Sequence, residues 1–313
     1  AVTSKMENYQ QNGSTSHFLY DRLVFNKIRE AFGGRIRVLI TSAAPINAEV
    51  LRFLKICFCA EFYEAYGQTE NSGAATHTDP SDPLIGHIGN VLPGVYAKVQ
   101  DIPDMKYYSS DKDEAGNALP RGELCLKGTI VFKGYYKDAQ KTSEAIDNDG
   151  WLHTGDIASI DISGRVRIID RKKAIFKLSQ GEYVAPEKVE NVYVLSRFVA
   201  QSWVYGDSLR DYTVGIVVPD EATLLREAKE KLNVSGSFLE LIKREDVKSL
   251  ILEDLKQVGK NSGLKGFEAV RKIYLDSEPF SPENGILTPT FKLKRNEAKA
   301  KYLDVIQKLY ENQ

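Results

Sequence analysis

The sequence predicts an α/β protein with two domains. First, residues 36–40 form an apolar run, interrupted near its start by Arg37, of the kind that parallel sheets bury. A small-residue loop and a helical pattern over 47–57 follow. Second, after Gly86 the chain changes to short β runs broken by turns, which suits a small β-barrel or meander. Third, helical and strand patterns alternate from Pro186 onward. We therefore expect a parallel βα sheet and a small β-barrel, followed by a compact α+β domain.

Local patterns predict the elements of the first half. Residues 1–17 are rich in Ser, Asn and Gln and predict a loop, and residues 19–31 predict an amphipathic helix that Gly33-Gly34 stops. Further strands are expected at 62–65, 95–101, 122–127, 130–135 and 165–169. Ligands in open α/β sheets bind at the carboxyl ends of strands. The loops that follow 36–40 and 62–65 are therefore candidate ligand sites.

The second half predicts a separate α+β domain of about 140 residues, an ordinary domain size. Pro186 suits a first helical position, and Glu187 and Glu190 favour the start of the same helix. Strands are expected at 198–205, 213–218 and 270–275, and helices at 222–232, 238–259 and 296–312.

The composition argues against several classes of function. The net charge of −1 gives no global field that would favour nucleic acid, so we expect no nucleic-acid partner. No apolar run is long enough to span a bilayer. The three cysteines show no metal-ligand spacing and the four histidines are scattered, so the cysteines are expected to be reduced, buried thiols.

Residues 149–183 combine a carboxylate with a dense group of cations. The hexapeptide WLHTGD is predicted to place Asp156 on a tight glycine turn, where the backbone can approach a ligand closely. The charged group Asp170-Arg171-Lys172-Lys173 follows. A carboxylate can accept the hydroxyl hydrogens of a ribose, and Arg and Lys can meet phosphate oxygens. This interpretation points to a nucleotide. The alternative is a hairpin with a solvated charged end.

The pentapeptide YGQTE at 66–70 allows a second set of nucleotide contacts. The Tyr66 ring beside Gly67 can stack on a purine, and the Thr69 hydroxyl can bond a phosphate oxygen. Glu70 offers Mg²⁺ a hard oxygen ligand, and this ion is usually held by one or two carboxylates together with substrate phosphates. The alternative is an ordinary turn with a surface acid.

Several motifs agree in order and spacing over nearly the whole chain with one family. The sequence motifs of this chain resemble the signature of the adenylate-forming (acyl-activating) enzymes. These motifs are WLHTGD, DRKK, APEKVE, YGQTE and ILTPTFKLKR. The likeness is strongest to eukaryotic long-chain acyl-CoA synthetases. It implies that residues 1–169 are the C-terminal part of a large ATP- and fatty-acid-binding domain. Residues 170–313 would be a small, mobile lid domain with a hinge near Asp170.

The resemblance also implies a role for individual residues. Tyr66, with Gly67, would contact adenine, Thr69 phosphate and Glu70 Mg²⁺. Lys292, which we expect on an extended segment after Pro289, would act on the carboxylate and α-phosphate as the catalytic lysine. Further nucleotide or coenzyme A contacts are implied for Ser42, Ala43, Ala44, Asp156, Arg171 and Gly181. Asp170, Lys173 and Lys177 match the hinge and linker motif. Lys294 and Arg295 are expected to be surface charges or contacts to coenzyme A phosphates.

The implied activity is the ATP-dependent conversion of a long-chain fatty acid to its acyl-CoA through an acyl-adenylate, with ATP, Mg²⁺ and coenzyme A. Two alternatives stay open: another acid–CoA ligase of the same superfamily, and a non-catalytic binding module. A phosphate loop of the YTSGTTGxPKG type does not occur in these 313 residues, so we expect a fragment with weak activity or none. The family implies an intracellular, cytosol-facing location, such as the endoplasmic reticulum or another organelle membrane, with peripheral membrane contact through upstream segments. It does not fix the oligomeric state.

Overall fold

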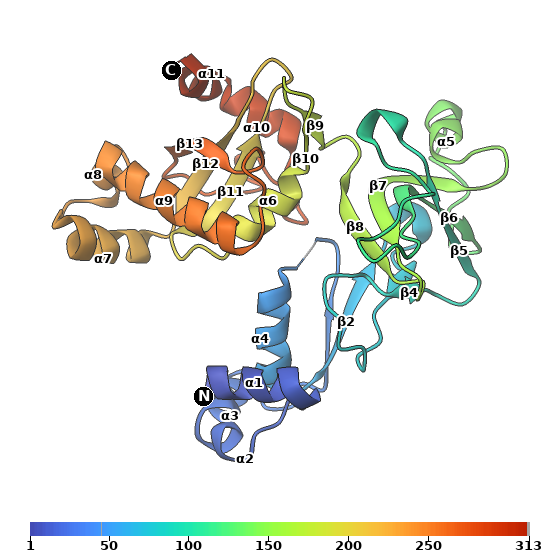
Figure 1. The fold of residues 1–313 in the computed structure, drawn as a ribbon, viewed down its shortest axis with the longest axis horizontal. Coiled ribbons are helices and arrows are strands. Elements are labelled where there is room, and N and C mark those ends of the chain that lie inside the picture. The colour runs from blue at the N-terminus through green and yellow to red at the C-terminus, as the bar shows by residue number, and fades with distance from the viewer. Residues whose placement is uncertain (45, 312–313) are drawn as a thin grey trace. The chain divides into compact units, whose positions relative to one another are not determined.

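The computed structural model describes residues 1–44 and 46–311, and it forms two compact units (Figure 1). Unit 1 comprises Ala1–Ile169 and unit 2 comprises Asp170–Gln313. Each unit has its own clusters of buried hydrophobic side chains. No helix in the described part of the chain is both long and apolar enough to cross a membrane.

Unit 1 begins with a helix where the sequence predicted a loop. Helix α1 spans Val2–Asn12 and ends at Gly13, whose φ of 72° forms a left-handed cap. Its Lys5 is fully buried and forms an ion pair with Asp21. The prediction failed because α1 has few apolar residues, and a tertiary ion pair stabilises it instead. The expected helix at 19–31 is confirmed as α2 (Phe18–Tyr20), a π-helical turn (Asp21–Phe25) and α3 (Asn26–Ala31).

The first sheet of unit 1 is mixed and has the order β1-β2-β3-β4. Strand β1 pairs with β2 in parallel, and helix α4 connects them as expected of a βα unit. The two later pairings are antiparallel. The expected burial of β1 is wrong, because the Ile40 side chain is 69% exposed. The elements are β1 (Val38–Thr41), α4 (Ala48–Phe58), β2 (Glu61–Tyr66), β3 (Thr76–His77) and β4 (Asn90–Val91).

The second sheet of unit 1 is an open meander with the order β5-β6-β7-β8, and no closed barrel forms among residues 1–44 and 46–311. The expected strand at 130–135 is wrong, because the Phe132 amide donates to the carbonyl of Glu70 and not to a neighbouring strand. The elements are β5 (Val95–Gln100), β6 (Arg121–Gly128), α5 (Ala139–Ala145), β7 (Leu152–Ile160) and β8 (Val166–Arg171), with short 3-10 turns at Thr69–Asn71 and Pro103–Met105. The last two residues of β8, Asp170 and Arg171, are counted in unit 2.

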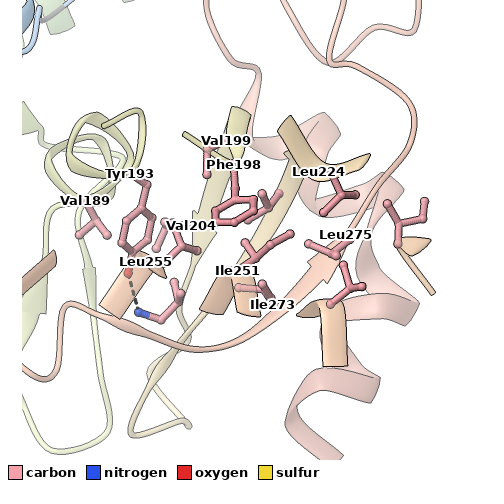
Figure 2. Packing of buried hydrophobic residues seen from close by; sticks show 14 of the residues in the cluster. Val189, Tyr193, Phe198, Val199, Val204, Leu224, Ile251, Leu255, Ile273 and Leu275 are labelled. Atoms are coloured by element: carbon pink, nitrogen blue, oxygen red, sulfur yellow. Dashed lines mark hydrogen bonds between the residues drawn. The ribbon is translucent and has the colours of Figure 1, made fainter. Parts of the chain in front are cut away.

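Unit 2 is built on the three-stranded sheet β11-β12-β13, which has helices on both faces (Figure 1). One face packs against α6, α7, α8 and α9, and Figure 2 shows Val189, Tyr193, Ile251 and Leu255 converging there on the strands. The other face packs against α10 and α11. The strands are β11 (Val199–Tyr205), β12 (Thr213–Pro219) and β13 (Val270–Leu275), and a separate hairpin joins β9 (Phe176–Lys177) to β10 (Tyr183–Val184).

The helices of unit 2 follow the predicted positions with two breaks. The predicted helix at 238–259 is divided, because a capping box at Ser237 starts α8 and acidic residues at Glu245 and Asp246 start α9. The predicted terminal helix is divided near Tyr302, and residue 312 lies outside the described residues. The helices are α6 (Pro186–Tyr193), α7 (Glu221–Leu232), α8 (Phe238–Leu241), α9 (Glu245–Asn261), α10 (Arg295–Lys301) and α11 (Leu303–Glu311).

Candidate functional site

The turn that follows β2 holds the candidate nucleotide residues of unit 1. Gly67 is required there by close packing, because a Cβ atom at this position would lie 2.1 Å from the carbonyl oxygen of Gly73. The Gln68 amide donates to Oδ1 of the fully buried Asn71 at 2.7 Å, which closes the turn. The backbone of YGQTE is therefore fixed by contacts within the turn itself.

Asp156 lies in the middle of β7 and contacts residues of the YGQTE segment. The sequence predicted a tight turn here, but Gly155 and Asp156 lie inside the strand, next to an irregularity in the pairing of β6 with β7. Gly155 has a φ of +72°, which favours glycine. The Thr154 hydroxyl donates to the carbonyl of Leu124 at 2.8 Å, which ties this irregular part of β7 to β6. Asp156 is thus presented by a sheet and not by a loop.

Tyr66 and Asp156, two residues predicted to contact a nucleotide, meet in unit 1. The Tyr66 hydroxyl donates to Oδ2 of Asp156 at 2.5 Å, across 90 residues of sequence. Gln68 was not singled out from the sequence, but its side-chain amide donates to the same oxygen at 2.7 Å and to the carbonyl of Thr154 at 3.0 Å. Asp156 is 6% exposed, so these donors compensate its desolvation.

Glu70 has a partner that the sequence gave no reason to expect. The Tyr135 hydroxyl donates to Oε1 of Glu70 at 2.7 Å, and this bond to a carboxylate raises the pKa of Tyr135 to about 12. Glu70 is half-buried and Thr69 is exposed. No group of three or more metal-ligating side chains occurs in the described part of the chain. One carboxylate nevertheless fits Mg²⁺, provided that substrate phosphates supply the other oxygens.

The small-residue loop follows β1 at the same sheet edge as YGQTE. Thr41 pairs with Glu64 in the parallel register, so Ser42, Ala43 and Ala44 leave the sheet beside the carboxyl end of β2. All three are exposed, and Ala43 has a φ of 74°. Pro45, the last residue of this motif, lies outside the described residues.

In unit 2, Asp170 is 1% exposed and holds the start of α6. Its carboxylate accepts hydrogen bonds from the amide of Arg171 at 2.6 Å and from the amide of Glu187 at 3.1 Å. Burial, with a contribution from the nearby charge of Glu187, raises the pKa of Asp170 to about 7. The residue predicted to be the hinge is therefore a buried acid that titrates near neutral pH.

The other predicted residues of the hinge and linker region are exposed. The Arg171 guanidinium lies 3.9 Å from the carboxylate of Glu187. The Lys177 ammonium lies 5.3 Å from the centre of the Tyr183 ring, across the β9–β10 hairpin. Gly181 lies at the tip of this hairpin with a φ of +92°, and Lys173 lies in the turn that precedes β9. These positions leave all four residues accessible to a ligand.

Lys292 lies in a hydrogen-bonded turn and not on the extended segment that the sequence predicted. The amide of Lys292 donates to the Thr288 hydroxyl at 3.0 Å, and the Thr288 amide donates to the Lys292 carbonyl at 2.8 Å. A bridge between Leu287 and Leu293 closes the turn. The Lys292 side chain is half-buried.

Arg295 is not the free surface charge that was one of its two expected roles, because its side chain is 21% exposed and ion-paired. Its guanidinium forms two hydrogen bonds to the carboxylate of Glu190 on α6, at 2.9 and 2.7 Å. Burial raises the pKa of Glu190, and the charge of Arg295 opposes this rise. The prediction failed because the partners are 105 residues apart and no local pattern joins them.

Comparison with known proteins places the chain in a family. The family model described as AMP-binding enzyme matches residues 6–136. The chain is 47% identical over 312 residues to long-chain-fatty-acid–CoA ligase 5 of Mus musculus, which covers 100% of this chain and 44% of the ligase. It is 46% identical over 299 residues to long chain acyl-CoA synthetase 6, peroxisomal, of Arabidopsis thaliana, covering 96% of this chain and 42% of that protein.

A solved structure extends the likeness to the fold. The chain matches the A domain of a carboxylic acid reductase from Segniliparus rugosus, solved with AMP and a co-purified carboxylic acid. The TM-score is 0.79 at 29% identity, and the match covers 99% of this chain and 45% of the reductase chain. The chain spans less than half the length of the curated relatives it matches. Since the motifs, the fold and the sequence identity agree, the chain belongs to the AMP-binding enzymes of the adenylate-forming superfamily.

Proposed function

We propose that this chain is part of an AMP-forming long-chain fatty acid–CoA ligase. The observation that carries the proposal is the contact of Tyr66 and Gln68 with Asp156, which joins two separate nucleotide motifs into one group of polar side chains. Identity of 46–47% to curated long-chain ligases over almost the whole chain supports this acid class. The reaction would couple an unreactive carboxylate to the cleavage of ATP.

In the first proposed step, a fatty acid carboxylate attacks the α-phosphorus of ATP, and pyrophosphate leaves. Asp156 would exchange its present donors for the ribose hydroxyls, while the Tyr66 ring packs against adenine. Mg²⁺, held by Glu70 and the phosphates, would neutralise phosphate charge. The Lys292 ammonium would stabilise the negative charge that gathers on the phosphoryl oxygens in the transition state.

In the second proposed step, the thiol of coenzyme A attacks the acyl carbon of the adenylate, and AMP leaves. The hairpin tip at Gly181 would border the path of the pantetheine arm, where a residue without a side chain leaves room. Arg171 would help to hold the ribose and phosphate, and Lys173 and Lys177 would stabilise one of two lid positions. We further propose an intracellular, cytosol-facing site of action, such as the endoplasmic reticulum, with peripheral membrane contact and no nucleic-acid partner.

The first test is a comparison of the two half-reactions in the full-length protein that carries this chain. Pyrophosphate release is measured with MgATP and palmitate, and thioester formation is measured separately from acyl-AMP and coenzyme A. Lys292→Ala is expected to slow pyrophosphate release by about 10²–10³-fold, the effect of losing one preorganised transition-state charge contact. Thioester formation should stay within about twofold of the wild type.

Lys294→Ala is the matched control, because it removes a neighbouring ammonium, which lies 3.8 Å from the carboxylate of Glu297. It should leave pyrophosphate release unchanged. If Lys292→Ala changes neither half-reaction, the assignment of the lysine is wrong. If the wild-type protein releases no pyrophosphate with any acid, the binding-module interpretation replaces the ligase.

A further inference from the structure

The turn that carries Lys292 is held from one side by a partly buried ion pair. Arg295 follows Lys292 by three residues and donates from Nη1 and Nη2 to the two carboxylate oxygens of Glu190, at 2.9 and 2.7 Å. This is the bidentate geometry that a guanidinium forms and an ammonium does not. Glu190 Oε1 also accepts the amide of Val204 on β11 at 2.9 Å. The pair therefore ties the Lys292 segment to α6 and to the central sheet of unit 2.

The same helix carries the contact to Asp170. The carboxylate of Asp170 accepts the amide of Glu187, in the first turn of α6, and Glu190 lies one turn further on. Arg295 Nη2 also approaches Glu187 Oε1 to 3.8 Å. Asp170, α6, Arg295 and the Lys292 turn thus form one continuous chain of polar contacts.

The turn itself transmits this anchoring to Lys292. The amide of Lys294 donates to the carbonyl of the buried Ile286 at 2.8 Å, and the Leu287–Leu293 bridge sets the register of the two arms. Three residues separate Thr288 from Lys292, and the backbone amides of both are bonded within the turn. Because both sides of the turn are fixed by these bonds, the contact between Arg295 and Glu190 sets the position of the Lys292 backbone.

We propose that Glu190 and Arg295 are positioning residues for Lys292, and that α6 joins the Lys292 turn to Asp170 so that the two move as one body. This inference rests on the proposed function, since it assigns the pair to the adenylation step. A buried ion pair is not by itself a stabilising device, because hydrophobic residues of similar volume often serve as well. Here the pair fixes the register of a turn, a use to which buried charges are suited.

The test uses Arg295→Lys in the full-length protein, with the two half-reactions measured separately. The lysine keeps the positive charge but cannot form the bidentate contact. Pyrophosphate release is expected to fall about 10–100-fold, because a displacement of about 1 Å in a reacting group has an effect of that size. The rate of thioester formation should remain within about twofold of the wild type. Glu190→Gln should likewise slow pyrophosphate release and leave thioester formation unchanged.

The matched control is Arg197→Lys. The Arg197 guanidinium forms an ion pair at 2.9 Å with the carboxylate of Glu227, a glutamate of unit 2 that is 3% exposed. The other ion-pair partners of Glu227 are Arg226 and Lys231 on α7, outside the Lys292 segment. This control changes another arginine–glutamate ion pair of unit 2 and should leave both half-reactions unchanged.

A second measurement does not depend on activity. Amide hydrogen exchange of the 313-residue chain should be at least about tenfold faster in Arg295→Lys at Thr288, Lys292 and Lys294, because the turn loses its anchor. Exchange at Ile251, in the core of α9, should not change. Faster exchange throughout unit 2, or equal loss of both half-reactions, would overturn the proposal and leave a structural role.

The two proposals can fail separately. If the wild-type protein adenylates a fatty acid but Arg295→Lys adenylates equally well, the positioning role is wrong and the ligase assignment stands. If the wild-type protein does not adenylate, the ligase assignment fails, and the exchange data alone decide whether Arg295 fixes the turn.

Discussion

The sheets of the two units differ in how they are covered. All seven residues of β12 in unit 2 are buried, because helices pack on both faces of its sheet. None of the four residues of β1 in unit 1 is buried, although β1 also carries a continuous apolar run and pairs in parallel. The same sequence signal therefore gives an enclosed or an open strand according to what packs on it.

This difference matters for the two groups of candidate residues. Ser42, Ala43 and Ala44 extend from the less covered sheet, on the exposed loop after β1. Lys292 lies on a segment whose neighbours Ile286 and Leu287 belong to an enclosed core. Each unit also contains one of the two tryptophans, Trp151 in unit 1 and Trp203 in unit 2, so fluorescence can follow the two units separately in single-tryptophan variants.

The largest expected effect contrasts a core residue of unit 2 with an apolar residue of β1. Leu255 on α9 is fully buried (Figure 2), so Leu255→Ala should lower the free energy of unfolding of unit 2 by about 2–5 kcal/mol. Ile40→Ala should lower that of unit 1 by less than about 1 kcal/mol. Urea unfolding followed by Trp203 or Trp151 fluorescence measures both. Equal losses of unfolding free energy in the two variants would show that β1 is covered in solution.

The next prediction concerns how the free energy of unfolding depends on pH, and it compares Asp170 of unit 2 with Glu64 of unit 1. Burial raises the pKa of Asp170 from 3.8 to about 7, and burial likewise raises that of Glu64 from 4.5 to about 7. The folded state then binds the proton more tightly than the unfolded state. The stability from this proton is complete below about pH 4 and is lost as the pH rises through about 7.

Between pH 4 and 8, unit 2 should therefore lose up to about 4 kcal/mol, the equivalent of about three pKa units. Asp170→Asn should flatten this slope in unit 2 and leave unit 1 unchanged, and Glu64→Gln should do the reverse. The measurement is urea unfolding at several pH values with each tryptophan signal. A slope that survives Asp170→Asn would mean that another group in unit 2 titrates, and the buried Glu190 is the first to examine.

The smallest expected effect concerns the turn in unit 1. Gly67→Ala brings a Cβ to 2.1 Å from a backbone oxygen, so the turn must shift, at about 1–3 kcal/mol of unit 1 stability. Because Tyr66 and Gln68 flank this glycine, the KM for ATP should rise as well. Gly266→Ala is the control, since a Cβ there meets no atom within 4 Å. A Gly67→Ala protein of normal stability and KM would contradict the close packing of the turn.

Much of the element order could be predicted from the sequence, because local rules govern it. Asn47 caps α4, Gly33 follows the end of α3, and the apolar patterns of α7 and β12 are unambiguous. The errors have tertiary causes. Helix α1 depends on the ion pair between Lys5 and Asp21, and residues 130–135 are kept from forming a strand by the bond from Phe132 to Glu70.

The sequence by itself determined the family and the candidate residues, because motif words such as YGQTE and WLHTGD are local and keep their order along the chain. Only the tertiary structure decided which of these residues meet. Tyr66 and Gln68 bind Asp156, Tyr135 binds Glu70, and Arg295 binds Glu190 through contacts that span 65 to 105 residues. Partners so far apart carry no periodic signal, since strand register and helix packing, and not chain neighbourhood, bring them within hydrogen-bond distance.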